Sequence, residues 1–345
     1  MSEQKRTEIS SIGEFGLIDR LTDQLKMVNP STLKGPGDDA AVINAGGMAQ
    51  LVSTDILVEG IHFDLAYAPL KHLGYKAVVT NLSDIYAMNA YPKQIVISLA
   101  LSNRFSVEAI EELYDGVKLA CERYQVDLVG GDTTASLKGL IISVTVIGEQ
   151  VAEKIAYRNG AKEGDLLCVS GDLGAAYLGL QILEREKQIH LENPDISPAL
   201  EKQSYLIERQ LKPEARKVII DDLEEFGIVP SAMIDISDGL SSEIIHLCKQ
   251  SNVGCQIEEE SLPISHEAYN QAMEFNIGPT TCALSGGEDY ELLFAVNPKY
   301  RQKMDDHPDI SVIGEFTDAI KGVKLHTKGD NYHDIVSLGW NSLKE

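Results

Sequence analysis

Hydrophobic residues in the first half of the chain follow two periods, one typical of helices and one typical of strands. Apolar positions three and four residues apart predict helices over residues 11–27 and 107–124. Pro69, which a first helical turn tolerates, marks the start of a helix predicted to run through about Met88. Short apolar runs between the helices predict strands at 41–43, 50–53, 94–101, 126–130 and 139–148. We therefore expect a sheet with helices on one face, an α+β arrangement.

The second half of the chain alternates strands with helices. Strands are predicted at 166–170, 232–236, 254–259, 291–296, 310–316 and 322–327. Helices are predicted from Gly174 to about Glu186 and at 201–210, 214–226, 239–251 and 265–276. The polar stretch 187–200 is predicted to be a loop. Because the pattern loosens around 149–162, we expect two domains, 1–150 and 151–345.

Size and charge narrow the class of protein. A chain of 345 residues is longer than single cores usually grow, which favours two domains. Its 53 acidic against 30 basic residues give a net charge of −23, which disfavours nucleic acid and anionic membranes as partners. The five cysteines show no Cys-x-x-Cys spacing and are interpreted as reduced. With no signal peptide and no apolar run long enough to span a bilayer, we expect a soluble, cytoplasmic protein.

Aspartates recur where an apolar run gives way to small residues. Five separate turns carry this pattern, which lets the backbone approach a ligand closely. Each aspartate alone is more often a helix cap or a turn former. Gathered in space, they form a site for Mg²⁺, which prefers oxygen ligands and can bridge carboxylates to phosphate. The candidates are Asp39, Asp55, Asp84, Asp132, Asp235 and Asp238.

The familiar phosphate-binding and nucleophilic motifs are missing from the sequence. There is no Walker-type loop, no kinase glycine loop and no Ser/His/Asp or Cys/His set. Gly171–Ala176 could direct a helix N-terminus at a phosphate, or form a simple turn between strand and helix. A phosphate monoester acceptor is largely dianionic at neutral pH and needs no general base. The sequence is therefore compatible with metal-assisted, in-line phosphoryl transfer.

Six motifs together resemble thiamine-monophosphate kinase, of the aminoimidazole synthetase and selenophosphate synthetase superfamily. They lie in order at 37–42, 53–63, 76–88, 130–134, 235–240 and 285–292. The resemblance implies an N-terminal α+β domain that pairs with a second subunit and a C-terminal α/β domain. It also implies a homodimeric enzyme for the last step of thiamine diphosphate synthesis. Thiamine phosphate and ATP would react with Mg²⁺ to give thiamine diphosphate and ADP, without a covalent phospho-enzyme.

The resemblance also assigns roles to individual residues. Metal ligands are implied at Asp39, Ser53, Thr54, Asp55, Asp84, Asp132, Asp235 and Asp238. Nucleotide contacts are implied at Tyr114, Gly131, Arg158 and Ser237. Thiamine phosphate contacts are implied at His62, Glu288 and Trp340, whose ring could stack on a cationic thiazolium. The alternatives are a related ATP-dependent enzyme, a metal-dependent phosphatase and a non-catalytic divalent-ion-binding protein. Selenophosphate synthetase would need a reactive cysteine near the N-terminus, but the first cysteine of this chain is Cys121.

Overall fold

The computed structural model describes Thr22 and residues 28–195 and 200–336. The predicted helix over 11–27, apart from Thr22, and Trp340 lie outside these described residues. Two sheets organise the described chain, the first formed within residues 32–150 and the second within 166–334. The assignment of 1–150 and 151–345 as domains stays a prediction.

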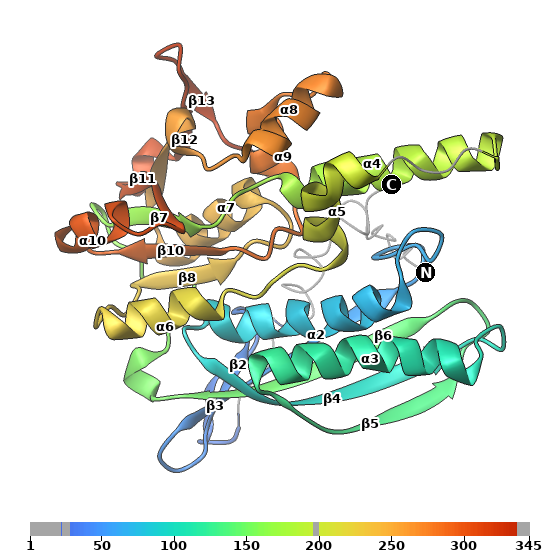
Figure 1. The fold of residues 1–345 in the computed structure, drawn as a ribbon. Coiled ribbons are helices and arrows are strands. Elements are labelled where there is room, and N and C mark those ends of the chain that lie inside the picture. Colours follow the sequence, from blue (N-terminus) through green and yellow to red (C-terminus); the bar gives the residue numbers. More distant parts are fainter. Residues whose placement is uncertain (1–21, 23–27, 196–199, 337–345) are drawn as a thin grey trace, which may run out of the picture.

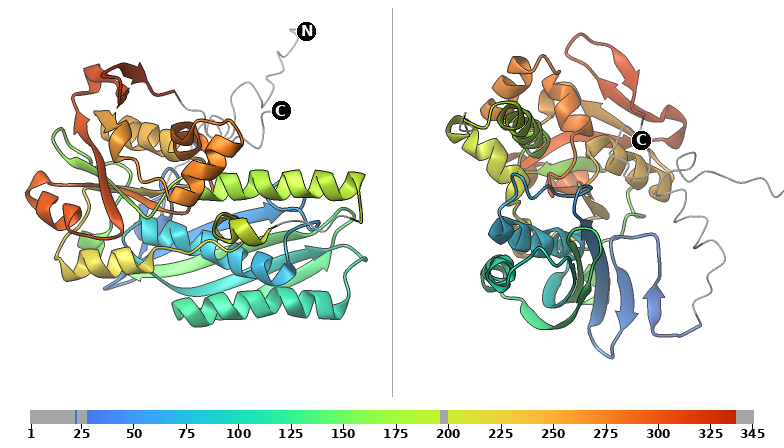
Figure 2. Two further views of the ribbon diagram at one scale, coloured as in Figure 1. Left: turned by 45° about the horizontal axis from the view of Figure 1, so that its top comes forward. Right: turned by 90° about the vertical axis from the view of Figure 1, so that its right-hand side faces the viewer.

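The first sheet has six strands, with α2 (Leu70–Ala87) and α3 (Val107–Tyr124) on one face (Figure 1, Figure 2). Among its described strands only β4 and β5 pair in parallel, and β5 forms one edge of the sheet. The predicted α+β arrangement with helices on one face is confirmed. The strand order is β1 (Thr32–Lys34), β2 (Ala41–Asn44), β3 (Ala49–Val58), β6 (Ile141–Gln150), β4 (Tyr91–Leu101) and β5 (Asp127–Ala135).

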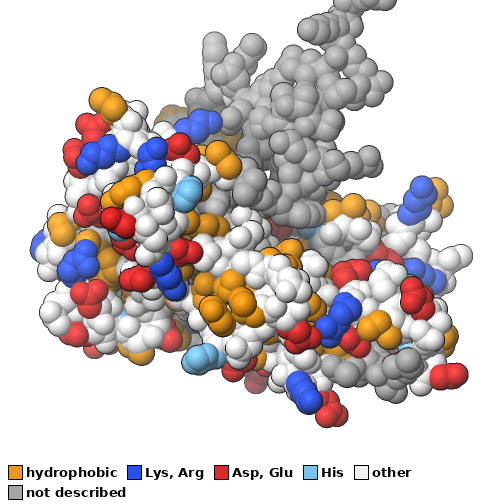
Figure 3. Space-filling view, turned by 90° about the horizontal axis from the view of Figure 1, so that it is seen from above, with side chains coloured by type: hydrophobic (Ala, Val, Ile, Leu, Met, Phe, Trp, Pro, Cys, Tyr) orange, Lys and Arg blue, Asp and Glu red, His pale blue; other side chains and the backbone are white. Residues whose placement is uncertain are grey.

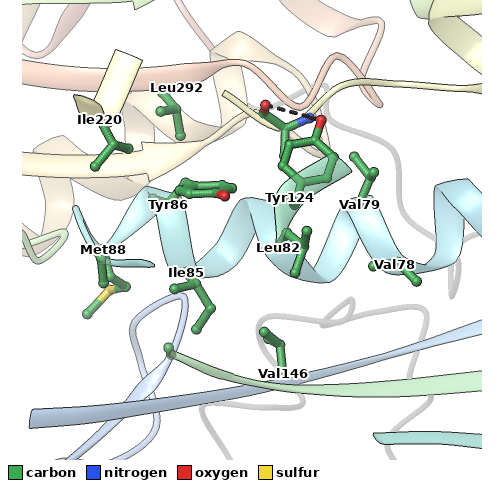
Figure 4. Close-up of a cluster of buried hydrophobic side chains, with 14 of the residues drawn as sticks. Val78, Val79, Leu82, Ile85, Tyr86, Met88, Tyr124, Val146, Ile220 and Leu292 are labelled. Carbon is green, nitrogen blue, oxygen red and sulfur yellow. Dashed lines mark hydrogen bonds between the residues drawn. The ribbon is translucent and has the colours of Figure 1, made fainter. Parts of the chain in front are cut away.

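Helix α2 lies at the centre of the molecule and is buried on all sides, as expected for a helix without a strong polar face. It packs on the first sheet through Ile85 and faces the second half of the chain through Tyr86, near Leu292 (Figure 4). Helix α3 packs tightly on α2 at glycines. A Cβ on Gly74 would lie 1.9 Å from the carbonyl oxygen of Leu113.

The second sheet is mixed and has seven strands, surrounded by helices. Its order is β13 (Tyr332–Asp334), β12 (Val323–His326), β9 (Gly254–Glu258), β11 (Ile310–Thr317), β7 (Leu166–Ser170), β10 (Leu292–Val296) and β8 (Ala232–Asp235). The helices are α4 (Ala175–Glu192), α5 (Ser204–Leu211), α6 (Lys217–Glu225), α7 (Leu240–Ser251), α8 (His266–Glu274), α9 (Pro279–Ser285) and α10 (Arg301–Asp305).

Several element boundaries predicted from the sequence are wrong. The strands predicted at 50–53 and 126–130 continue to Val58 and Ala135, so Asp55 and Asp132 lie within β3 and β5 and not in turns. The expected loop over 187–200 begins too early, because α4 continues to Glu192. The polar residues after Glu186 include good helix formers and extend the helix into solvent. Pro194 then disfavours helical geometry at Asn193, where the helix ends. The short elements β1, β13, α9 and α10 were not predicted either.

None of the helices in the described part is both long enough and apolar enough to cross a membrane. On the face shown in Figure 3, acidic and basic side chains are interspersed over the described part of the surface. This mixture gives no broad basic area on that face for a nucleic acid backbone.

Candidate active site

Three aspartates from distant parts of the chain meet between the two sheets. Asp39 lies in the turn before β2, Asp84 on α2 and Asp235 at the end of β8. One carboxylate oxygen from each lies within 4.8 Å of the other two. Asp39 lies in a turn and Asp235 at a strand end, as the sequence predicted, whereas Asp84 lies within α2 and not in a turn. The structure nevertheless brings these three candidates together.

The three carboxylates carry more negative charge than their protein neighbours balance. Burial raises the pKa of Asp84 well above its usual range, and the charges of Asp55, Asp235 and Asp39 raise it further. Burial likewise raises the pKa of Asp235 to about 8, with Asp39 as the next cause. Hydroxyl groups oppose the shift: Ser53 donates to Asp84 at 2.6 Å and Ser83 to Asp235 at 2.7 Å.

Arg158 supplies a positive charge on one side of the cluster. Its Nε and Nη2 atoms donate to the two oxygens of Asp39 at 2.9 and 2.6 Å. Burial lowers the pKa of Arg158, but the carboxylates of Asp39, Asp38 and Asp235 together raise it by more, so the guanidinium stays charged. One cation beside three carboxylates leaves an excess of hard, anionic oxygens at close range. This donor set fits Mg²⁺.

Main-chain hydrogen bonds connect the loop after β8 to the loop 286–291, next to the aspartates. The N–H of Glu288 donates to the carbonyl of Ser237 at 2.7 Å, and the N–H of Tyr290 donates to the carbonyl of Ile236 at 2.9 Å. Gly287 has φ +74°, and a Cβ there would lie 2.8 Å from the Ser237 oxygen, so only glycine fits. The predicted residues Ser237, Asp238 and Glu288 are therefore held close together on adjoining loops.

Glu243, which was not predicted, fixes the loop that carries Ser237 and Asp238. Its buried carboxylate accepts the N–H of Asp238 at 2.9 Å and the N–H of Ser237 at 3.3 Å. Burial raises the pKa of Glu243, and the charge of Asp238 is the next cause. An acidic residue in the first turn of a helix was the available signal, because such residues bind free N–H groups there.

His62 and Glu288, the described thiamine phosphate candidates, lie toward the N-terminal end of α2. The N–H of Val58 donates to Nδ1 of His62 at 3.0 Å, which assigns the proton of the neutral ring to Nε2. Glu288 contacts Lys76 on α2 through Oε1, at 3.0 Å, and Gln210 on α5 through Oε2, at 2.6 Å. Lys76, Gln210 and His62 also line one small cavity.

A second group of candidates lies elsewhere on the first sheet. Gly131 and Asp132 on β5 line a pocket of about 520 Å³ with Tyr114 of α3. Asp132 on β5 pairs with Ser98 on β4. Ser98 is exposed, whereas its neighbours Ile97 and Leu99 are buried toward α2. Because side chains alternate along a strand, Ser98 and Asp132 both lie on the face away from α2.

Thr54 shares that outer face with Asp132. Its hydroxyl interacts with the Val144 carbonyl at 3.0 Å and the Thr145 hydroxyl at 2.9 Å. Its neighbour Ser53 points the other way, to Asp84. Two strands separate β3 from β5, which corresponds to roughly 14 Å. Within one chain, the structure does not bring the Asp132 carboxylate or the Thr54 hydroxyl to the three aspartates.

Asp55 lies on the α2 side of the sheet, and its N–H donates to Oδ1 of Asn81 at 3.0 Å. Its charge raises the pKa of both Asp84 and Asp235, after the larger effect of burial, so it borders the cluster. The helix start at Gly174 is already occupied, because its N–H donates to both Asp289 oxygens at 3.1 and 3.0 Å. The alternative of a simple turn, and not a phosphate site, is therefore favoured at 171–176.

Comparisons with known proteins agree on one family. Residues 37–150 match the N-terminal domain of AIR synthase related proteins, and residues 162–325 match the C-terminal domain. Thiamine-monophosphate kinase of Aquifex aeolicus is 36% identical over 325 residues, covering 93% of this chain and 98% of that protein. The Bacillus subtilis protein of the same name is 35% identical, covering 96% and 99%.

A solved structure described as "AaThiL complexed with AMPPCP and TMP" superimposes on this chain with a TM-score of 0.80. It is 34% identical, and the match covers 99% of both chains. The resemblance inferred from the six sequence motifs is thus confirmed, as is the two-domain aminoimidazole-synthetase-like fold.

Proposed function

The chain belongs to the thiamine-monophosphate kinase family, and on this basis we propose that it transfers the terminal phosphoryl group of ATP to thiamine phosphate. The products are thiamine diphosphate and ADP. The observation that carries the proposal is the placement of two sets of polar groups along α2, with the three aspartates at one end and His62, Lys76 and Glu288 at the other.

The spacing of these two sets suits the acceptor. Lys76 and Asp84 are eight residues apart on α2, which is a rise of about 12 Å. Thiamine phosphate is an elongated molecule, with an aminopyrimidine at one end and a phosphate at the other. With its rings near His62 and Glu288, its phosphate points along α2 toward the aspartates. Trp340 stays a proposed contact for the ring end.

Asp39, Asp84 and Asp235, with Ser53 and Asp55 beside them, are the residues that would hold Mg²⁺. Asp238 on the adjoining loop is a further proposed ligand. When bound, Mg²⁺ neutralises phosphate charge and lets two anions approach in line. Arg158 and Ser237, which border the same site, are proposed to bind and orient the nucleotide phosphates. No side chain has to accept a proton, because the acceptor phosphate is largely dianionic.

We place the nucleotide base in the pockets beside α3 and β5, at one edge of the first sheet. An apolar groove of about 500 Å³, lined by Phe105, Ile110 and Tyr114 among others, adjoins the pocket of Gly131 and Asp132 through Tyr114. Because β5 is roughly 14 Å across the sheet from β3, which carries Ser53 and Asp55 beside the aspartates, we propose that a second copy joins the two halves of the site.

We propose that the homodimer forms by pairing of two copies through the outer face of the first sheet. That face carries Ile56, which is 54% exposed, and β5 carries Val129, which is 59% exposed. Exposed apolar side chains beside an uncovered strand edge are typical of an interface. In the proposed dimer, Asp132 and Thr54 complete the metal and nucleotide site together with the partner's aspartates.

A mixture of two inactive variants tests the shared site. Asp132→Asn and Asp84→Asn subunits, unfolded and refolded together, should recover about a quarter of wild-type activity, because half of the dimers are mixed and each has one intact site. Each variant refolded alone is the control. No recovery from a mixture shown to contain mixed dimers would contradict a site shared between copies.

The reaction itself is tested by product analysis after incubation with ATP, Mg²⁺ and thiamine phosphate. We expect equal amounts of thiamine diphosphate and ADP, and neither product with EDTA. Free thiamine in place of thiamine phosphate is the acceptor control. ADP formed without thiamine diphosphate would indicate another acceptor or a phosphatase, and would contradict the proposal.

A further inference from the structure

Glu288 is held by Lys76, which begins the 76–88 motif, and by Gln210, and the sequence assigned a role to neither residue. Lys76 contributes an ammonium group 3.0 Å from Oε1 of Glu288, and Gln210 donates from Nε2 to Oε2 at 2.6 Å. Lys76 also donates to the main-chain carbonyl of Gln210 at 3.0 Å, which closes a ring of three contacts. The ring joins α2, α5 and the loop 286–291, so three separate segments determine where the Glu288 carboxylate points.

The burial of the three side chains is unequal. The side chain of Lys76 is 6% exposed, whereas that of Glu288 is 28% exposed. Gln210 is buried as well. A buried lysine loses its hydration and is stabilised by its anionic partner. The arrangement thus buries the two donors and leaves part of the carboxylate open to a ligand.

We propose that Lys76 and Gln210 are positioning residues that hold Glu288 ready to accept hydrogen bonds from the amino group of the acceptor's pyrimidine ring. The inference rests on the proposed function and extends it to the choice of acceptor. An ionised carboxylate only accepts hydrogen bonds, so it favours a ring bearing an –NH₂ group over one bearing a carbonyl oxygen at that position. Lys76 contacts one carboxylate oxygen of Glu288 and Gln210 contacts the other, which leaves the Glu288 side chain few alternative rotamers.

A simple ion pair joining the two halves of the chain is the competing explanation. Lys154 and Glu224 form such a pair at 2.7 Å, with side chains 44% and 50% exposed. That pair joins Lys154, in the short 3-10 helix Ala152–Lys154 after β6, to Glu224 on α6, and both side chains are exposed. It provides a matched control, because Lys154→Met is the same substitution as Lys76→Met at an ion pair outside the site.

The test compares two acceptors, thiamine phosphate and its analogue with a carbonyl oxygen in place of the pyrimidine amino group. The ratio of their kcat/KM values is independent of how much of a variant is folded. We expect the wild type to prefer thiamine phosphate by roughly 10- to 150-fold, the range for one hydrogen bond to a charged group. Lys76→Met and Gln210→Leu should each lower this ratio toward one, and Lys154→Met should leave it unchanged.

A double-variant cycle shows whether Lys76 acts through Glu288. If it does, Lys76→Met should change the acceptor ratio little further in a chain that already carries Glu288→Gln. KM for ATP should stay within about twofold in both positioning variants, because the nucleotide contacts are elsewhere.

The outcomes separate the inference from the proposed function. An acceptor ratio that Lys76→Met and Gln210→Leu leave unchanged would overturn the inference while the kinase activity stands. A wild type that does not discriminate between the two acceptors would overturn it also. A wild type that makes no thiamine diphosphate at all would overturn the proposed function, and with it the inference.

Discussion

Two groups of carboxylates, one beside the loop 286–291 and one carried by that loop, have different surroundings. In the first group, Asp39, Asp84 and Asp235 face one another with Arg158 as the neighbouring cation. In the second, Glu291 accepts hydrogen bonds from Arg209, Arg216 and Ser170. The first group concentrates negative charge, whereas the second balances it.

The difference indicates what each group is for. Burying like charges together costs free energy, which is retained where a cation or a reaction needs the site. A carboxylate surrounded by arginines needs no further ligand and instead connects the segments that carry them. Asp289 is intermediate: burial raises its pKa to about 7, while Arg209 and the Gly174 N–H lower it. The balanced group therefore supports the loop that positions Glu288.

The largest expected effect is on turnover when the first group loses a charge. Asp84→Asn should lower kcat by about 10³-fold, because one anionic oxygen ligand is lost and metal-dependent stabilisation of the transition state is worth several kcal/mol. The free energy of unfolding in EDTA should be unchanged or higher, since the substitution removes repulsion. Steady-state kinetics and a guanidinium titration measure both quantities.

Asp305→Asn, at an exposed ion pair on α10, is the control and should leave kcat unchanged. An Asp84→Asn protein that turns over like wild type at saturating Mg²⁺ would remove Asp84 from the metal site. A variant that loses stability and activity together would assign the first group to folding.

The second group should show the opposite response. Glu291→Gln leaves Arg209 and Arg216 without their shared carboxylate in a fully buried position, so unfolding should become easier by about 3 kcal/mol. A denaturant titration measures the loss. Glu224→Gln, which breaks an exposed ion pair with Lys154, is the matched control and should cost less than about 1 kcal/mol. Equal losses in the two variants would contradict the contrast drawn here.

Stability in the absence of metal should depend on pH in a defined direction. The pKa of Asp235 rises from 3.8 in the unfolded chain to about 8 in the fold, so the native state holds a proton that the unfolded state releases. This contribution to stability is complete below pH 3.8 and is lost as pH rises through about 8. Mg²⁺ at a hundredfold excess over its Kd should restore roughly 2–3 kcal/mol.

Thermal unfolding with EDTA and with Mg²⁺, at pH 6 and at pH 8.5, tests this linkage. The rise in Tm caused by Mg²⁺ should be larger at pH 8.5, where bound protons no longer compete with the metal. In Asp235→Asn, the rise should be small at both values. A larger rise at pH 6 in the wild type would contradict the charge assignment.

The contrast also explains how far the sequence alone could predict the site. Asp39, Asp84 and Asp235 each follow a local pattern of small residues, so their roles were predicted before any contact was known. Lys76 and Gln210 depend on Glu288, and the Gln210–Glu288 contact spans 78 positions. Periodicity and local motifs contain no information on such pairs.

The same limit applies to the fold. Helix α3 and most strands have strong local periodicity and were predicted; α2 lacks a strong polar face and was predicted from Pro69 at its start. The short β1 and β13 have three residues each, too few to show a period, and depend on pairing with β2 and β12. The extent of α4 depended on residues that favour helices without an apolar pattern. Long-range pairing decided the two short strands, and helix propensity without an apolar pattern decided the end of α4.

The smallest expected effect concerns an exposed pair of carboxylates around one histidine. Hydrogen bonds from the His326 ring to Asp330 and Glu258 raise its pKa above 6.5, and the ring stacks on Tyr332 with centroids 4.5 Å apart. The protonated ring stabilises the β12–β13 hairpin; this contribution is complete below pH 6.5 and is lost as pH rises through the raised pKa. An NMR titration should place the midpoint of the His326 ring above pH 6.5. Asp330→Asn should lower this midpoint, because the hydrogen bond to Asp330 is the largest cause of the raised pKa. The free energy of unfolding of the whole chain should change little, because a solvent-exposed ion pair contributes little to stability. A His326 midpoint at or below pH 6.5 would show that the hydrogen bonds to Asp330 and Glu258 do not stabilise the protonated ring in solution.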